Sequence, residues 1–352
     1  MRKASLILVA VVLACIAEFW WYQRQNGAPP VASAATVAEV SVPAQATALA
    51  RAPEPAVALQ IDRQETIEVV EGTPLIFSVT IGNYRAANTM LHNAANRVLV
   101  EAIEADIAAK KIDAKEVAEE LARLRQPIPV REVRLGGAAV GWKDYVQFAE
   151  LRPDGSRRPL PWALRLAVAP QSASLALGAK EAAQLEYLLD PTNAQRIAPG
   201  RYQVLVALQL PAGREAPPGT WQGRVESQPV ALTIAPRPAK QPSKQTEQEQ
   251  MRFARYYQAA KDWPHALESA QKVRTANKDS IAASLLIGEV KEAQGDLDGA
   301  LEAFGAGLTQ FYQQHPKSYE PPLYTMDKIE RIEEQLALGK ARSANFNKGR
   351  SP

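Results

Sequence analysis

Residues 262–267 read Asp-Trp-Pro-His-Ala-Leu, and residues 296–301 read Asp-Leu-Asp-Gly-Ala-Leu. The second stretch repeats the first at an offset of 34 residues, and Ala270 maps onto Phe304 at the same offset. A fixed period of this length on segments with helical hydrophobic spacing is typical of stacked helix–turn–helix units. The repeat therefore predicts an all-helical region over residues 249–338.

The repeated segment, from about residue 247 to 314, resembles the tetratricopeptide repeat family. In that family two antiparallel helices pack through a large, a small and an aromatic residue on the first helix and a small residue on the second. The matching positions of the first repeat are Phe253, Ala254, Tyr257 and Ala266. Those of the second repeat are Ile287, Gly288 and Ala300. Lys291 replaces the expected aromatic residue, and Lys278 stands where the family has a closing proline.

Two repeats alone are usually too few to bury a continuous core, so a further helix is expected from Leu323 to Leu338. The resemblance implies that the array binds a peptide or protein partner on its concave surface, through first-helix side chains. Those positions in this sequence are Met251, Arg255, Gln258, Leu285, Glu289 and Glu292. The alternative for each of them is an ordinary solvated or packing position.

Residues 59–236 have mainly strand-like spacing. Phe77, Val79 and Ile81 alternate with Ser78 and Thr80, which gives one buried face. The other expected strands are Thr66–Val70, Arg131–Leu135, Tyr145–Leu151, Trp162–Val168, Leu185–Leu189, Tyr202–Leu210, Trp221–Glu226 and Val230–Ile234. Short strands separated by Gly/Pro turns predict an antiparallel β-sandwich, immunoglobulin-like in style. The overall fold class is thus multidomain α and β.

Residues 86–125 interrupt this pattern with helical spacing. Leu91, Ala95 and Val98 begin one apolar stripe, and Val117 and Leu121 belong to a second. We expect a helical hairpin inserted between two strands. It either covers an open edge or end of the sandwich or forms a binding surface.

The N-terminus has the pattern of an export signal or membrane anchor over residues 1–23. Arg2 and Lys3 precede the uncharged run Ala4–Ala17, which would span about 21 Å as a helix. The aromatic cluster Phe19–Tyr22 brings the run close to the roughly 30 Å of a bilayer core and favours an uncleaved anchor. Two alternatives are lipidation at Cys15, which follows a lipobox-like Val-Leu-Ala, and cleavage after residues 32–34. Each predicts an extracytoplasmic location.

Three polar or small-residue segments separate these units. Residues 24–58 are rich in Ala and Pro and are expected to be a tether, and residues 237–248 a linker. Residues 339–352 are polar and are expected to be a disordered tail. Cys15 is the only cysteine, so no disulfide can form within the chain.

The sequence contains no recognisable catalytic or metal-binding motif. Its net charge of +3 is spread along the chain, which argues against nucleic-acid binding. The three histidines lack ligand spacing, and there is no phosphate-binding loop of the Walker type and no nucleophile elbow. We therefore expect a non-enzymatic protein without a metal or cofactor.

Two functions of different class remain. The first is a membrane-tethered adaptor that binds a protein partner through the repeats. The second is a β-sandwich that binds carbohydrate or another small ligand, with the helices in a structural or dimerising role. Burial of Trp142, Trp162 and Trp221 would remove the main candidates for stacking against a sugar.

Overall fold

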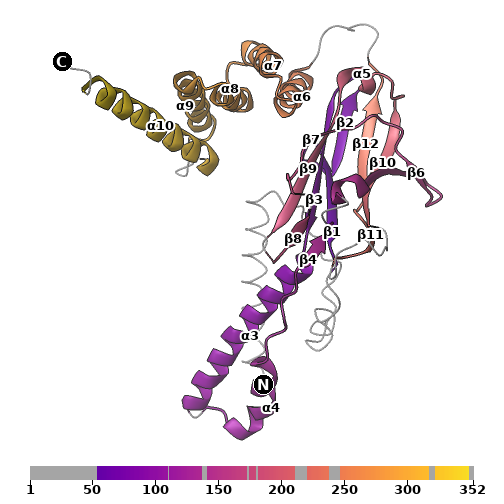
Figure 1. The fold of residues 1–352 in the computed structure, drawn as a ribbon, viewed down its shortest axis with the longest axis vertical. Helices are drawn as coiled ribbons and strands as arrows, with labels where there is room; N and C mark the ends of the chain where they lie inside the picture. The colour runs from indigo at the N-terminus through magenta and orange to yellow at the C-terminus, as the bar shows by residue number, and fades with distance from the viewer. Residues whose placement is uncertain are drawn as a thin grey trace.

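The computed structural model combines a β-rich region with a following helical region, in agreement with the predicted order (Figure 1). It describes residues 54–109, 111–136, 141–172, 174–179, 181–210, 220–237, 246–316 and 322–348. The expected anchor, Cys15 and nearly all of the expected tether lie outside the described residues. None of the helices in the described ranges is both long enough and apolar enough to cross a membrane.

The β-rich region contains two main sheets and one small one. The first sheet is antiparallel, in the order β1 (Ala56–Ile61), β3 (Leu75–Gly82), β9 (Ala182–Leu189) and β7 (Arg165–Val168). The second has the order β2 (Thr66–Val70), β12 (Val230–Ala235), β10 (Gly200–Leu210), β5 (Val146–Leu151) and β6 (Arg157–Pro159), with β11 (Gly223–Glu226) also paired to β10. β4 (Val133–Leu135) and β8 (Leu175–Leu177) form the small sheet. The β2–β12 pair is parallel, so the expectation of a wholly antiparallel arrangement is wrong at that edge.

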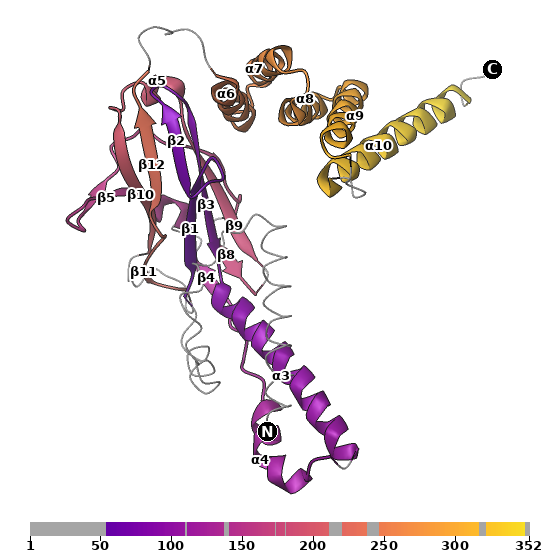
Figure 2. The ribbon, with the colours of Figure 1, turned by 180° about the vertical axis from the view of Figure 1, so that it is seen from behind.

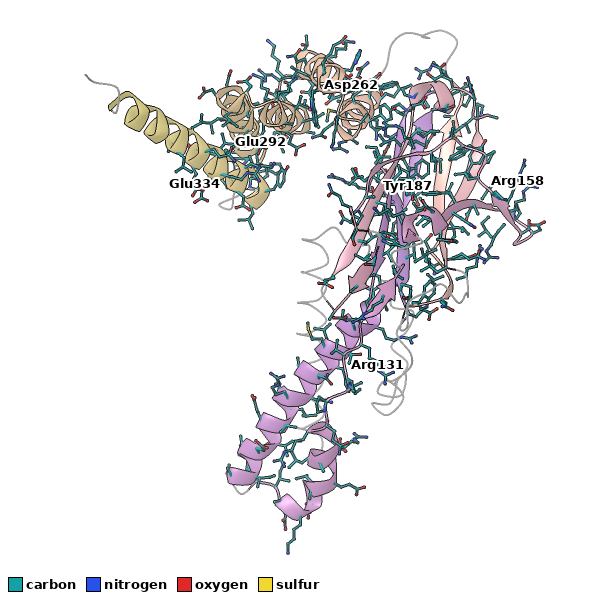
Figure 3. The ribbon with its side chains drawn as sticks, in the orientation of Figure 1. Arg131, Arg158, Tyr187, Asp262, Glu292 and Glu334 are labelled. Atoms are coloured by element: carbon teal, nitrogen blue, oxygen red, sulfur yellow. The ribbon has the colours of Figure 1, made fainter. Side chains whose placement is uncertain are left out.

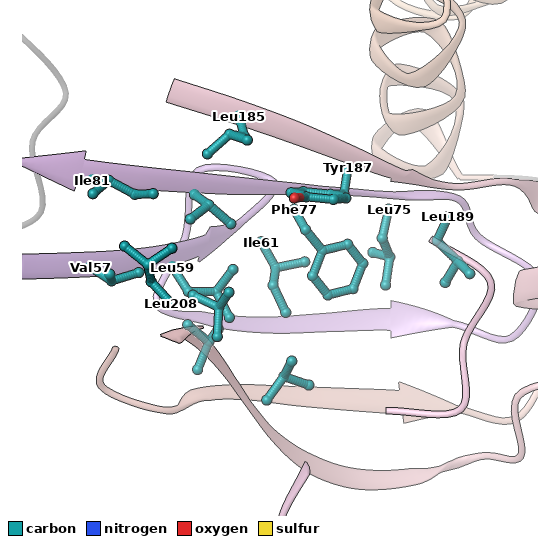
Figure 4. Close-up of a cluster of buried hydrophobic side chains, with 14 of the residues drawn as sticks. Val57, Leu59, Ile61, Leu75, Phe77, Ile81, Leu185, Tyr187, Leu189 and Leu208 are labelled. Atoms are coloured by element: carbon teal, nitrogen blue, oxygen red, sulfur yellow. The ribbon is translucent and has the colours of Figure 1, made fainter. Parts of the chain in front are cut away.

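One hydrophobic core is shared by the main sheets, because inward-facing residues alternate along the strands of both (Figure 4). Phe77 is fully buried and meets Phe148 of the other sheet edge-on at a ring distance of 5.8 Å. Phe148 in turn meets Tyr187 at 4.9 Å. Such edge-on aromatic pairs add about 0.5–1.5 kcal/mol each to the free energy of area burial.

The strands β1 and β7 differ from the ranges expected from the sequence. β1 begins at Ala56, inside the expected tether, because Val57, Leu59 and Ile61 alternate into the core. The expected strand Trp162–Val168 is reduced to β7, and a bulge between Leu166 and Val168 leaves both of these side chains exposed.

The inserted segment contains α3 (Tyr84–Ala108) and α4 (Ala114–Leu124). These helices extend away from one end of the β-rich region instead of lying over a sheet edge (Figures 1 and 2). Only Ala86 and Thr89, near the start of α3, are buried within that helix. Farther along, the Asn93 amide binds both backbone groups of Ile128, at 2.7 and 2.9 Å, which ties the returning chain to α3.

Asn83 fixes the base of this hairpin. Its side-chain oxygen accepts a hydrogen bond from the Ala86 N–H at 3.0 Å and so caps α3. Its amide nitrogen donates to the carbonyl oxygens of Arg131 and Leu177, at 2.9 and 3.0 Å. We expect Asn83→Ala to lower the free energy of unfolding by about 2–4 kcal/mol, because it removes a cap and leaves buried polar groups unpaired. Urea unfolding checks this, with the exposed Asn88→Ala on the same helix as a control expected to change stability by less than about 0.5 kcal/mol.

The helical region is a run of antiparallel neighbours: α6 (Glu247–Ala259), α7 (Trp263–Ala276), α8 (Ile281–Ala293), α9 (Leu297–Gln314) and α10 (Leu323–Lys348). The repeated aspartates begin equivalent helices. Asp262 caps α7 through the His265 N–H, and Asp296 caps α9 through the Gly299 N–H. The alanines that follow each cap, Ala266 and Ala300, are fully buried, which lets the paired helices approach closely.

The expected disordered tail is wrong for most of its length, since α10 continues through Lys348. Alanine, lysine and arginine in residues 339–348 favour helix, and a polar composition alone does not end one. The expected linker also ends earlier than predicted, because Thr246 caps α6 and Glu247 begins it.

Candidate functional site

A groove of about 880 Å³ lies between the helical region and the β-rich region. Residues of α6, α8 and α10 form one wall, and the β1–β2 turn with parts of β3 and β9 forms the other. Figure 3 shows Glu292 of α8 on the helical side of the gap between the two regions. The volume falls within the range of ligand-binding clefts.

The groove is lined by most of the positions that the repeat resemblance implies for partner binding. Arg255, Gln258, Leu285, Glu289 and Glu292 all line it.

Met251 is the exception. Its exposed fraction is 9%, and it packs in the core of the helical region. It reaches only a smaller neighbouring groove of about 400 Å³, which shares Asp62, Arg252 and Arg255 with the larger one. Met251 is therefore chiefly a packing residue.

Hydrogen bonds hold the acidic groups of this wall in place. Gln258 of α6 donates to Glu289 of α8 at 2.6 Å, and the Tyr324 hydroxyl of α10 donates to the other oxygen of Glu289. Glu292 accepts from Lys328 at 2.8 Å and also from Arg331. Burial opposes ionisation of Glu292, but these two cations outweigh it and hold its pKa below the ordinary value. Both glutamates are thus committed to contacts within the protein.

Arg252 of α6 connects the two walls of the groove through its side chain. No motif or repeat in the sequence marks this residue. Its guanidinium donates to the Glu68 carbonyl oxygen at 2.8 Å. It also forms an ion pair with Asp62, whose carboxylate oxygen lies 3.4 Å from the Arg252 Nε. Both side chains are about nine-tenths buried, at 9% and 10% exposure. The contact therefore connects α6 to the β1–β2 turn.

A second connection starts from the cap of α6. Thr246 and Glu249 exchange hydrogen bonds of 2.8 and 3.2 Å in a capping box. The other oxygen of Glu249 accepts from Arg237 at 3.1 Å, and Arg237 also donates to the Glu71 carbonyl oxygen at 2.9 Å. The helix start is thereby fixed to the end of β2.

The β1–β2 turn has an unusual backbone. Asp62 and Arg63 have φ values of 49° and 63°, between Ile61 and Gln64, which exchange backbone hydrogen bonds of 2.9 and 3.0 Å. Two successive residues with positive φ define the type I′ hairpin turn, which normally contains Asn-Gly or a similar pair. The Asp-Arg pair adopts this conformation at a cost of about 1 kcal/mol or more per residue.

The three tryptophans that were candidates for stacking against a sugar are buried or half-buried. Trp142 is fully buried, and Trp162 and Trp221 are half-buried against the main core. Trp162 contacts Phe77 and Tyr202 edge-on. No cluster of His, Cys, Asp and Glu suited to a metal ion occurs in the part of the chain that the structure describes.

No protein-family model and no curated protein sequence matches the chain.

Proposed function

We propose that the chain is an extracytoplasmic, membrane-tethered adaptor that binds a protein partner through a tetratricopeptide-like array of α6–α10. The observation that carries this proposal is that five of the six positions implied by the repeat resemblance line one groove. The β-rich region would be an immunoglobulin-like sandwich that supports the array. The basic and apolar N-terminus supports export and tethering.

A peptide segment of the partner fits the groove better than a small apolar ligand. Leu285 and Leu286 provide apolar contact, while arginine, glutamine and glutamate side chains alternate with them along the walls. Binding clefts for small molecules are mostly apolar with few polar groups. A peptide carries a polar backbone and mixed side chains, so it matches a lining of mixed character.

The occupant would touch both regions at once, because the turn at Asp62 and Arg63 lines the same groove as α8. The contacts of Arg252 and Arg237 fix the two walls relative to each other. A groove held in this way loses less conformational entropy on binding than one whose walls move independently.

The test is to fill the groove without disturbing the packing. Ala282 is exposed at the start of α8 and lines the groove, so Ala282→Trp should block it. We expect recovery of the bound partner in crosslinking affinity purification to fall by at least about tenfold, which corresponds to roughly 1.4 kcal/mol. The matched control is Ala276→Trp at the exposed end of α7, which is not among the groove residues and should leave recovery unchanged.

The proposal would be contradicted if the Ala282→Trp variant still bound the partner and a variant with an altered α3–α4 hairpin did not. It would move the binding surface to the hairpin.

A further inference from the structure

Most charged groups of the groove already have a partner. Asp62 pairs with Arg252, and the hydrogen bonds given above engage Glu289 and Glu292. Arg63 and Arg255 differ from these. Within the described residues neither donates a hydrogen bond or forms an ion pair, and both are exposed on the groove.

These two arginines approach the same part of the groove from opposite walls. Arg255 lies on α6 three residues, or about one helical turn, beyond Arg252, which pairs with Asp62. Arg63 directly follows Asp62 in the turn on the opposite wall. Because Asp62 contacts Arg252, the guanidinium groups of Arg63 and Arg255 lie near the point where the two walls meet.

The strained turn is independent evidence that Arg63 has a role beyond the fold. Glycine would relieve the positive φ of 63° at this position, yet the chain has an arginine there. Strain of this kind is found at binding and switch sites, where surrounding contacts maintain it. Here it directs a cationic side chain into the groove.

One carboxylate of the lining has no ion-pair or hydrogen-bond partner among the described residues. Glu186 of β9 lies opposite Ser78 of β3, two residues beyond Ile76, whose N–H binds Asp62. Among the charged groove residues that have no ion-pair or hydrogen-bond partner in the described part of the chain, two are arginines and one is a glutamate, so their net charge is positive.

We propose that the groove selects an acidic peptide segment, whose side-chain carboxylates bind between Arg63 and Arg255. This inference rests on the proposed function and adds the chemistry of the partner. Guanidinium groups bind carboxylates through paired, charge-assisted hydrogen bonds, so two unpaired arginines on opposite walls of one groove suit this group. Leu285 would contact the apolar side chains of the same segment.

The probes are three labelled peptides of equal length with leucines at the same positions, whose other positions are glutamate, serine or lysine. Fluorescence anisotropy with the full chain measures their affinities. We expect the acidic peptide to bind most tightly and to lose affinity as salt is raised. Arg63→Glu with Arg255→Glu should weaken the acidic peptide by roughly a hundredfold and reverse the preference toward the lysine peptide.

Arg63→Gly separates binding from folding. It should preserve or raise the melting temperature, because glycine suits the turn, while weakening the acidic peptide by roughly tenfold. Equal binding of the acidic peptide by wild type and the double glutamate variant would overturn the inference.

The remaining outcomes distinguish the two proposals. If the serine or lysine peptide binds best and Ala282→Trp blocks it, the groove is a peptide site but the acidic selectivity is wrong. If no peptide binds at any salt concentration, both the selectivity and the peptide-binding groove are rejected.

Discussion

Gly288→Val should be among the most destabilising single substitutions in the helical region, lowering its free energy of unfolding by about 3 kcal/mol or more. A Cβ atom at this position would lie 2.9 Å from three ring atoms of Phe304. That ring is fully buried between α8 and α9, so it cannot move aside without opening the core. The gain in helix propensity over glycine is below about 1 kcal/mol and does not compensate.

The matched control is Gly305→Val, because a Cβ at Gly305 meets no atom within 4 Å. It should change stability by less than about 0.5 kcal/mol. Thermal unfolding followed by far-ultraviolet circular dichroism measures both variants, and 1 kcal/mol corresponds to about 4–8 °C for a region of this size. Equal melting temperatures for the two variants would show that the close approach of Gly288 to Phe304 does not make a larger side chain at position 288 destabilising.

A double variant checks the assigned cause. If the clash with the ring is responsible, Gly288→Val should cost much less in a Phe304→Ala background than in the wild type. The same pair explains why the second repeat departs from the first at Ala270 and Phe304: the larger side chain of α9 requires the glycine of α8.

The helical region was predictable because its signals are local. Asp262 and Asp296 cap helices a few residues away, and the alanines after them determine the helix spacing within the same repeat. The positions facing the groove were implied by the resemblance to the tetratricopeptide repeat family. Met251 is more buried than the other expected positions, because a resemblance identifies a helix face but not how deeply each side chain is covered by its neighbours.

The other wall of the groove was not predictable from local patterns. Arg252 meets Asp62 and Glu68 across more than 180 residues of sequence, a separation that a single sequence cannot pair. The turn was missed because Asp-Arg lacks the Asn-Gly signal of a type I′ turn. β1 was missed because its alternating Val57, Leu59 and Ile61 follow an Ala/Pro-rich segment.

Arg252→Met should lower the free energy of unfolding by about 3–5 kcal/mol. The substitution keeps much of the side-chain volume but leaves the Asp62 carboxylate nine-tenths buried without its cation. It also leaves the Glu68 carbonyl oxygen without its donor. The control Lys272→Met breaks an exposed pair with Glu268 and should cost less than about 0.5 kcal/mol.

The pH dependence of the stability lost in Arg252→Met shows whether the loss comes from the unpaired charge of Asp62. Burial raises the pKa of Asp62 above its ordinary value of 3.8, against the hydrogen bond from Ile76 and the charges of Arg252 and Arg255. A carboxyl group whose pKa is raised in the folded state destabilises the fold as the pH rises from the unfolded pKa through the folded pKa. In that range the folded state binds more protons than the unfolded chain, so each increase in pH favours unfolding. Without Arg252 the pKa of Asp62 rises further, so the deficit is full at neutral pH and shrinks as the pH falls toward 3.8.

Urea unfolding of Arg252→Met and wild type between about pH 7 and pH 4 measures this difference. The double variant Asp62→Asn with Arg252→Met should recover part of the loss at pH 7, because a neutral amide needs no cation and still accepts the hydrogen bond from Ile76. A deficit that stays constant across this pH range, and that Asp62→Asn does not reduce, would mean that Arg252 stabilises the protein through packing and its Glu68 hydrogen bond alone. The ion pair would then have no part in connecting the helical region to the turn that carries Arg63.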